Sequence, residues 1–275
     1  MATVGNRYPL VMVLSTLAWL PSIAQMPIDS ARLVEAIRRE PPFGIFKDNY
    51  FITGAPIGKT PTRYNADAKF QISFKHRLTD RKLPFGTYLF LTYTQKSFWN
   101  IYQESSPFEE TNYNPGMGLG KLLFRNGKLD GIALLQVEHE SHGLPPEGSR
   151  SWNRLSANYL KFVTANLLVG LKVWLPFGYT KDNEDLIEYI GFQELIAHWR
   201  AANRLLFDVQ LRKSADWNNR GSLQAGLSYK IDSDANQYLY LQWWQGYTES
   251  LIEYEQVSSM LRLGIAIKPP FPDYY

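Results

Sequence analysis

The feature that most constrains the fold of this 275-residue chain is a two-residue alternation of apolar and polar side chains between positions 49 and 268. The alternation is clear in FQISFK (70–75), in TYLFLTYTQ (87–95) and in LRLGIAIK (261–268). Successive side chains of a β-strand point to opposite faces, whereas those of a helix return to one face every three to four residues. The pattern therefore predicts strands and not helices.

The lengths of these segments and of their connectors indicate the kind of β-structure. A membrane strand needs about 9–11 residues, and nearly all of the segments are at least this long. Tight turns such as RNGKLDG (125–131) alternate with longer connectors such as 141–151 and 247–258, which is typical of outer-membrane barrels. A soluble β-sandwich also contains many alternating strands, but the strand lengths and the aromatic residues at strand ends, as in WWQGY (243–247), favour a barrel.

We therefore expect an all-β fold, a transmembrane antiparallel β-barrel of about twelve strands, as a single domain over residues 49–275. The segments that carry the alternation are 49–56, 67–78, 86–98, 111–125, 129–141, 151–164, 167–179, 189–201, 203–213, 221–231, 237–248 and 258–268.

The N-terminus predicts export. Residues 1–24 combine one cation, the apolar run LVMVLSTLAWLP (10–21) and a small-x-small site before Gln25, as a secretory signal peptide does. Residues 25–48 are expected to form a polar N-terminal arm, with a short helix or loose segment at 30–40. The chain has no cysteine, which excludes disulfides, thiolate catalysis and Cys-based zinc sites. Its net charge of +3, without a basic stripe, gives no indication of nucleic-acid binding.

Candidate reactive residues lie where two of these segments form a hairpin. In GIALLQVEHES (131–141), His139 and Ser141 alternate in phase with the apolar residues, so we expect them on the outer face of the barrel. In the next segment, SWNRLSANYL (151–160), Asn153 is also in phase with the apolar residues and can lie across the hairpin from His139. Polar groups that face lipid are costly unless they are paired, so this cluster suggests a function.

The three residue types fit a nucleophilic triad. Ser141 would attack, His139 would take its proton, and Asn153 would orient the imidazole by accepting a hydrogen bond from Nδ1. A substrate that meets this face at headgroup level would be a phospholipid ester. The alternatives are an ordinary polar surface and a metal site at HESH (139–142). The metal site has less support, because His139 and His142 lie on opposite faces of a strand and the helical HExxH spacing is absent.

Two further observations concern the rest of the chain. There is no G-x-S-x-G element, so a soluble α/β-hydrolase is not supported. The stretch KDNEDLIEY (181–189) is expected to be a solvated loop.

At these positions the sequence resembles the outer membrane phospholipase A family, barrel enzymes of the Gram-negative outer membrane. The resemblance covers nearly all of residues 49–268, and the H-x-S-x-G and S-R-S-W-N-R elements stand at the family's separation. The stretches that carry it are YTQKSFW (93–99), ESSPFEETNY (104–113), HESHG (139–143), SRSWNRL (149–155) and GYTESLIEY (246–254).

The resemblance implies a role for each residue of the hairpin site. Ser141 would be the nucleophile, His139 the general base and acid, and Asn153 the residue that orients His139. The backbone N–H groups of Ser141 and Gly143 would form the oxyanion hole. The three triad assignments agree with the chemistry expected from the residue types alone, whereas the oxyanion hole rests on the resemblance.

The resemblance also implies calcium as the cofactor, bound at the interface of a homodimer. The matching ligands are the Ser149 hydroxyl, the Leu144 carbonyl and Ser105 of the partner subunit, a neutral set that predicts weaker binding than a carboxylate cage. Gln95 matches the family's membrane-embedded dimer contact. Two departures concern calcium. Leu144 stands where the family usually has arginine, and Pro146 stands where a second, monomer-type site has aspartate.

The expected activity is calcium-dependent hydrolysis of acyl esters in phospholipids and lysophospholipids, with A1, A2 and lysophospholipase specificity, by a membrane-embedded homodimer. The alternative is a non-enzymatic porin or adhesion barrel of the same architecture. A porin predicts lumen charges that form a conductive ring, and no role for Ser141.

Overall fold

The computed structural model of the chain describes residues 41–143, 148–178, 183–214, 220–232 and 235–269. The predicted signal peptide (1–24) and the segment 30–40 lie outside these residues. No helix in the described part of the chain is both long enough and apolar enough to cross a membrane.

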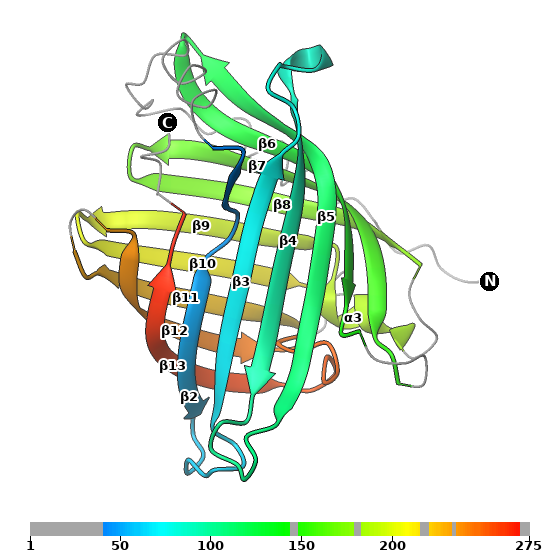
Figure 1. Cartoon of the computed structure of the whole chain (residues 1–275), viewed down its shortest axis with the longest axis vertical. Helices are drawn as coiled ribbons and strands as arrows, with labels where there is room; N and C mark the ends of the chain where they lie inside the picture. The colour runs from blue at the N-terminus through cyan, green and yellow to red at the C-terminus, as the bar shows by residue number, and fades with distance from the viewer. Residues whose placement is uncertain (1–40, 144–147, 179–182, 215–219, 233–234, 270–275) are drawn as a thin grey trace.

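Twelve antiparallel strands, β2 to β13, form a closed barrel (Figure 1), as the alternation predicts. Each strand pairs with the next along the chain, and β13 pairs with β2 to close the ring. A short strand, β1, pairs with β3 beyond the end of β2. The strands are β1 (Phe43–Ile45), β2 (Asn49–Pro56), β3 (Asp67–Arg77), β4 (Tyr88–Trp99), β5 (Phe108–Arg125), β6 (Lys128–Ser141), β7 (Ser151–Thr164), β8 (Leu167–Phe177), β9 (Gln193–Ala202), β10 (Leu205–Lys213), β11 (Gly221–Lys230), β12 (Gln237–Gly246) and β13 (Ser258–Ile267).

The alternation in sequence becomes an apolar outside and a polar inside. In β13, Leu263 and Ile265 are 56% and 58% exposed on the outer face, whereas Arg262 is 2% exposed on the inner face. A closed barrel leaves no strand edge with unpaired backbone groups, which is what a bilayer interior requires. The apolar outer band is the surface that contacts lipid tails.

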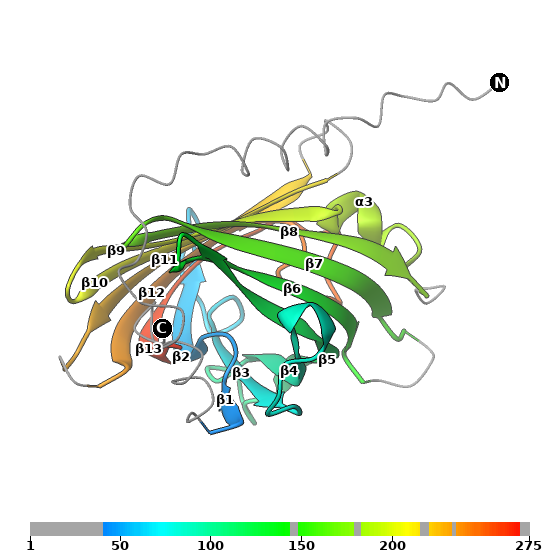
Figure 2. The same cartoon turned by 90° about the horizontal axis from the view of Figure 1, so that it is seen from above.

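The two ends of the barrel differ, as the connectors predict. We call the end with the tight turns at 126–127, 165–166 and 203–204 the short-turn end, and the opposite end the long-loop end. Viewed from above, β6 to β9 form a broad wall, and β1 to β4 lie across the interior from it (Figure 2). The connector between β6 and β7, which carries part of the candidate site, is at the long-loop end.

The expectation that residues 181–189 form a solvated loop is wrong for the part that the structure describes. Residues Leu186–Ile190 form a short helix, α3, and β9 consequently begins at Gln193 and not at 189. Leu186 and Ile190 are buried because they pack against aromatic residues of the barrel interior and of the last long loop. This cluster, which we call the loop-end cluster, consists of Trp152, Trp174, Leu186, Ile190, Leu251 and Tyr254.

The predicted N-terminal arm (25–48) is described only from residue 41 onward. Its last residues enter the sheet, because Phe43, Gly44 and Ile45 pair with His76, Lys75 and Phe74 of β3. Lys47 and Asp48 then lead directly into β2 inside the barrel, where Asp48 forms an ion pair with Lys268.

Candidate active site

The β6–β7 hairpin brings the candidate triad together on the outer face. His139 pairs with Asn153 across the two strands, and Ser141 lies two residues further along β6. Val137, two residues before His139 on the same face, is 52% exposed. Glu138, which lies between Val137 and His139, faces the interior and is 2% exposed. The predicted orientation of His139, Ser141 and Asn153 toward the outside is therefore the observed one.

Asn153 holds the imidazole of His139 through a direct hydrogen bond. Its Oδ1 lies 2.9 Å from His139 Nδ1, and its amide Nδ2 donates to the carbonyl of Gly178 at 3.0 Å. The second bond fixes which end of the Asn153 amide faces the ring. An acceptor at Nδ1 favours the tautomer with hydrogen on Nδ1, which leaves Nε2 as the proton acceptor.

Ser141 and Gly143 lie at the point where β6 ends. Ser141 is half-buried, on the same face as His139. Gly143 has φ +69°, and a Cβ at this position would lie 3.0 Å from the ring of Tyr113. Both the backbone conformation and the close aromatic ring therefore favour glycine at this position.

His142 faces the interior, as the alternation predicts, and is 5% exposed. Its Nε2 accepts a hydrogen bond from the backbone N–H of Arg150 at 2.8 Å. This bond spans the connector between β6 and β7 and joins its two ends. His139 therefore faces outward and His142 faces inward, so the two cannot bind one metal ion, and their positions do not support a metal site at HESH.

A charged cluster inside the barrel lies directly behind the triad. Arg154 donates to both oxygens of Glu138, at 3.0 and 3.1 Å, and to Glu140 at 2.9 Å. Lys172 of β8 lies 2.8 Å from Glu138. Removing one partner from such a buried cluster leaves an uncompensated charge and costs about 3–5 kcal/mol. These bonds join β6, β7 and β8 and so hold the register that pairs His139 with Asn153.

This charged cluster was not singled out from the sequence, although a signal was present. Pairing His139 with Asn153 places Glu138 opposite Arg154, because residues of antiparallel strands pair in reverse order. Opposite charges at paired positions on an inner face predict an ion pair.

The residues proposed for calcium are placed less completely. Ser105 is exposed in the connector between β4 and β5, with φ +61°. Ser149 is half-buried in the connector between β6 and β7, and Leu144 and Pro146 lie outside the described residues. Both serines are at the long-loop end. Among the described residues, no three His, Asp or Glu side chains converge as a metal site.

Gln95 lies on the outer face of β4, in phase with Leu91, which is 41% exposed. Its Oε1 accepts from the Tyr93 hydroxyl at 3.1 Å and its Nε2 donates to Ser97 Oγ at 3.3 Å. A hydrogen-bonded amide on a lipid-facing surface is in a suitable place for a contact between subunits.

Comparison with known proteins gives a consistent result. The family model for phospholipase A1 matches residues 50–267. Phospholipase A1 of Escherichia coli K12 is 35% identical over 212 residues, which are 74% of this chain and 71% of the relative. Phospholipase A1 of Salmonella typhimurium is 34% identical over the same length and with the same coverage.

Two solved structures have a similar fold. Outer membrane phospholipase A from Escherichia coli superposes with a TM-score of 0.73 and 29% identity, over 83% of this chain and 99% of that chain. The Salmonella typhi outer membrane phospholipase, a dimer with bound calcium, gives a TM-score of 0.75 and 29% identity, over 87% of this chain and 98% of that chain.

Proposed function

Since the chain belongs to the phospholipase A1 family, we propose that it is a calcium-dependent serine hydrolase of the Gram-negative outer membrane. It cleaves acyl esters of phospholipids and lysophospholipids on the outside of its barrel and acts as a homodimer. The observation that carries this proposal is the hydrogen bond between His139 Nδ1 and Asn153 Oδ1, with Ser141 two residues away on the same lipid-facing surface.

The triad performs the reaction in two steps. His139 takes the proton of the Ser141 hydroxyl as its oxygen attacks the ester carbonyl, and then gives that proton to the departing glycerol oxygen. Water releases the acyl chain from Ser141 by the same route. Asn153 keeps the ring in place and in the required tautomer, but unlike an aspartate it brings no charge to stabilise the imidazolium.

The carbonyl oxygen gains negative charge during the attack and needs donors. We assign this role to the backbone N–H groups of Ser141 and Gly143. When bound, calcium would add positive charge that polarises the same oxygen. Its ligands would be Ser149, the Leu144 carbonyl and Ser105 of the partner subunit.

The donor chemistry of these residues fits calcium, because Ca²⁺ takes hydroxyl and carbonyl oxygens. Two observations support a shared site. Ser105 and Ser149 lie at the same end of the barrel, and Ser105 is exposed, so a second subunit can approach it. The outward-facing Gln95 would contact the partner within the membrane.

The porin alternative predicts an open, conductive lumen. Here the loop-end cluster and the last long loop (247–257) lie across the interior at the long-loop end. Glu249 of this loop pairs with Lys69 and Arg262, and Glu110 accepts from the backbone N–H groups of Leu251 and Ile252. Charges bound in this way are not available to form a conductive ring.

The test is hydrolysis of phospholipid by the refolded full chain, with calcium and with excess chelator, for the wild type and Ser141→Ala. The proposal expects calcium-dependent release of fatty acid that is lost in Ser141→Ala. Lys128→Ala, at the exposed first residue of β6, is the matched control. Hydrolysis that persists in Ser141→Ala, or wild-type activity that chelator leaves unchanged, would contradict the proposed mechanism.

A further inference from the structure

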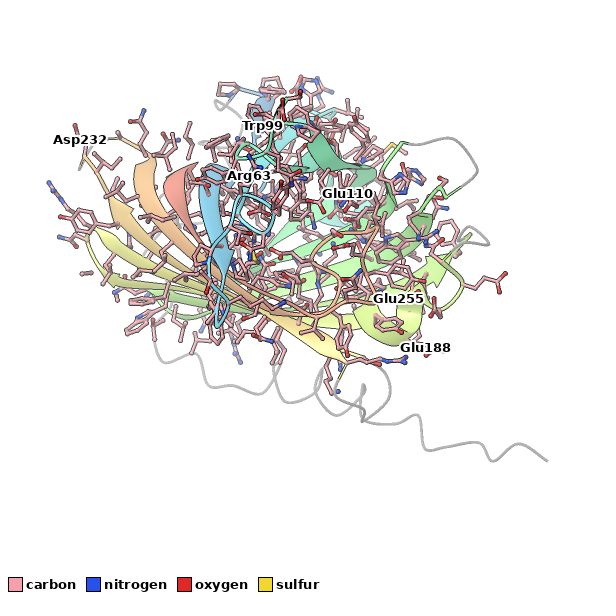
Figure 3. The ribbon with its side chains drawn as sticks, turned by 90° about the horizontal axis from the view of Figure 1, so that it is seen from below. Arg63, Trp99, Glu110, Glu188, Asp232 and Glu255 are labelled. Atoms are coloured by element: carbon pink, nitrogen blue, oxygen red, sulfur yellow. The ribbon has the colours of Figure 1, made fainter. Side chains whose placement is uncertain are left out.

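The barrel contains a cavity that the proposed chemistry on the outer face does not use. Its volume is about 490 Å³, and it extends to the short-turn end, where Arg77, Phe162 and Pro269 line it. At the opposite end the loop-end cluster and residues 247–257 lie across the interior. Seen from that end, side chains crowd the region between Glu110, Glu188 and Glu255 (Figure 3). The cavity is therefore a blind pocket that opens toward the short-turn end.

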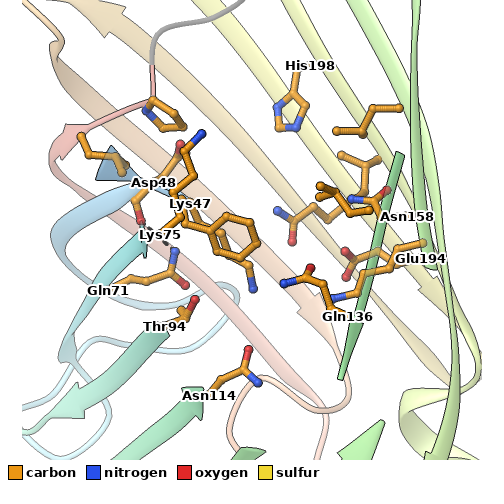
Figure 4. A pocket seen from close by; sticks show the side chains of 18 of the residues that line it. Lys47, Asp48, Gln71, Lys75, Thr94, Asn114, Gln136, Asn158, Glu194 and His198 are labelled. Atoms are coloured by element: carbon orange, nitrogen blue, oxygen red, sulfur yellow. Dashed lines mark hydrogen bonds between the residues drawn. The ribbon is translucent and has the colours of Figure 1, made fainter. Parts of the chain in front are cut away.

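The chain places a lysine in this pocket by a local irregularity. Ile45 pairs with Phe74 and Tyr50 pairs with Gln71, so residues 46–49 occupy the length of only residues 72 and 73. The excess chain bulges inward and puts Lys47 and Asp48 into the cavity lining. Figure 4 shows both of them beside Gln71, across the cavity from Glu194. A bulge is a common way to redirect a side chain toward a site.

The charge of Lys47 is not neutralised by a neighbouring carboxylate. Asp48, beside it, pairs with Lys268, and Glu194 across the cavity pairs with Arg212. Lys47 Nζ forms no ion pair with any described residue. Ten Lys and Arg residues line the cavity against four Asp and Glu, so the surroundings add to the positive potential. Lys47 Nζ lies 5.7 Å from the centre of the Phe46 ring, a contact that leaves the charge in place, and a cation in a cavity without an ion-pair partner favours an anionic ligand.

Two further polar side chains point into the cavity without a partner. The Tyr88 hydroxyl and both polar atoms of the Asn112 amide have no hydrogen-bond partner among the described residues, although the two residues are only 9% and 2% exposed. Buried polar groups in native proteins are normally satisfied. Asn112 pairs with Lys96, which is opposite Gln71, so it is level with Lys47 and can donate to an anionic group there. Tyr88 lies eight residues from Lys96 along β4 and can donate to a polar group at the other end of a ligand.

Part of the cavity wall, toward the short-turn end, is mainly apolar. Phe90, Leu134, Leu160 and Phe162 belong to the lining, and Leu160 and Phe162 pack in a cluster with Leu168. The interior of an outer-membrane barrel is ordinarily polar, so an apolar wall beside a cationic group is unexpected. Together they match a molecule that has one charged end and a hydrocarbon chain.

We propose that the interior cavity binds a long-chain carboxylate, with its carboxylate group at Lys47 and its hydrocarbon chain along the wall formed by Phe90, Leu134, Leu160 and Phe162. This site is separate from the Ser141 site, because the inner and outer faces of the barrel do not communicate through the strands. It binds a ligand without chemical change, and it does not depend on the proposed hydrolysis.

The test uses a long-chain carboxylate with a photoreactive diazirine near its tail, added to the refolded Ser141→Ala chain, with peptide mass spectrometry of the labelled sites. We expect label on peptides that contain Phe90, Leu134 or Leu160. Lys47→Met should lower this labelling by at least about tenfold, the loss expected from one charge-assisted hydrogen bond. Lys47→Arg should retain it, and Lys128→Met, at the exposed first residue of β6, should not change it.

Competition in the otherwise unchanged protein keeps the proposal testable if Lys47→Met does not fold. Unlabelled carboxylate should displace the probe, whereas an alcohol of the same length and inorganic phosphate should both be much weaker competitors. Label confined to outward-facing residues, or interior label that Lys47→Met leaves unchanged, would overturn the proposal. Displacement by phosphate as effective as by the carboxylate would overturn the role of the apolar wall.

Discussion

Replacing Asn153 is the most direct test of how the outer-face site works. The side chain forms two hydrogen bonds, one with His139 Nδ1 at 2.9 Å and one to the Gly178 carbonyl at 3.0 Å. Asn153→Ala removes both, but only the first reaches the imidazole. Because Asn153 is on the outer face and outside the charged cluster behind it, the barrel should remain folded.

The size of the effect follows from the bond that is lost. A hydrogen bond to a charged group contributes about 1.5–3 kcal/mol, and His139 becomes charged as it takes the serine proton. Each 1.36 kcal/mol in the barrier changes the rate about tenfold. Asn153→Ala should therefore lower kcat by roughly 10- to 200-fold, with a small change in KM. Asn153→Asp should fall between wild type and Asn153→Ala, because its carboxylate still accepts from Nδ1 but no longer donates to Gly178.

The assay is initial-rate hydrolysis of a phospholipid in mixed micelles at saturating calcium, with the folded fraction of each variant measured by heat-modifiable gel mobility. Wild-type kcat in folded Asn153→Ala would refute the orienting role. Activity of Asn153→Asp below that of Asn153→Ala would show that the acceptor at Nδ1 is not what Asn153 contributes.

Three other predictions follow from the same structure. A sulfonyl fluoride should label Ser141, and His139→Ala should slow that labelling by orders of magnitude, which mass spectrometry of the modified peptide can measure. Ser149→Ala should raise the calcium concentration required for activity and the calcium concentration required for dimerisation together, because the same bound ion would serve both; by linkage, calcium favours the dimer by the factor by which the dimer binds calcium more tightly than the monomer. Sedimentation in density-matched detergent across a calcium titration measures dimerisation, and the same titration of hydrolysis shows whether activity follows it. Burial raises the pKa of Glu249, but the charges of Lys69 and Arg262 outweigh it and lower the pKa from 4.5 to about 2. Because the folded pKa is the lower one, Glu249 stabilises the fold above about pH 4.5, and this contribution is lost as the pH falls toward 2. Glu249→Gln should therefore make the thermal unfolding midpoint less dependent on pH between about 4.5 and 2.

The barrel and the face of each site residue could be predicted from the chain because both depend on a local property. A strand's two-residue period assigns His139 and Asn153 to the outside whatever the rest of the molecule does. Hydrophobic length and turn chemistry then place the strand ends within a few residues, and most of the predicted segments agree with β2 to β13.

The features that escaped prediction depend on contacts between distant parts of the chain. In the sequence, Leu186 and Ile190 are apolar residues within a charged connector, where exposure is expected. They are buried because Leu251 and Tyr254 of the last long loop pack against them. The inward position of Lys47 likewise results from a mismatch in length between its segment and β3. No short-range pattern encodes either arrangement.

The pairing of His139 with Asn153 also limits how genes for such a chain can change in length. Deleting one residue from β6 before His139 would move His139 and Ser141 to the inner face. Deleting two would keep the face but displace them along the strand by about 7 Å, away from Asn153. A deletion in a connector that carries no proposed site residue, such as the one between β11 and β12, changes neither face nor pairing at the site. Inherited insertions and deletions should therefore collect in the connectors, while the strands around the site diverge by substitution alone.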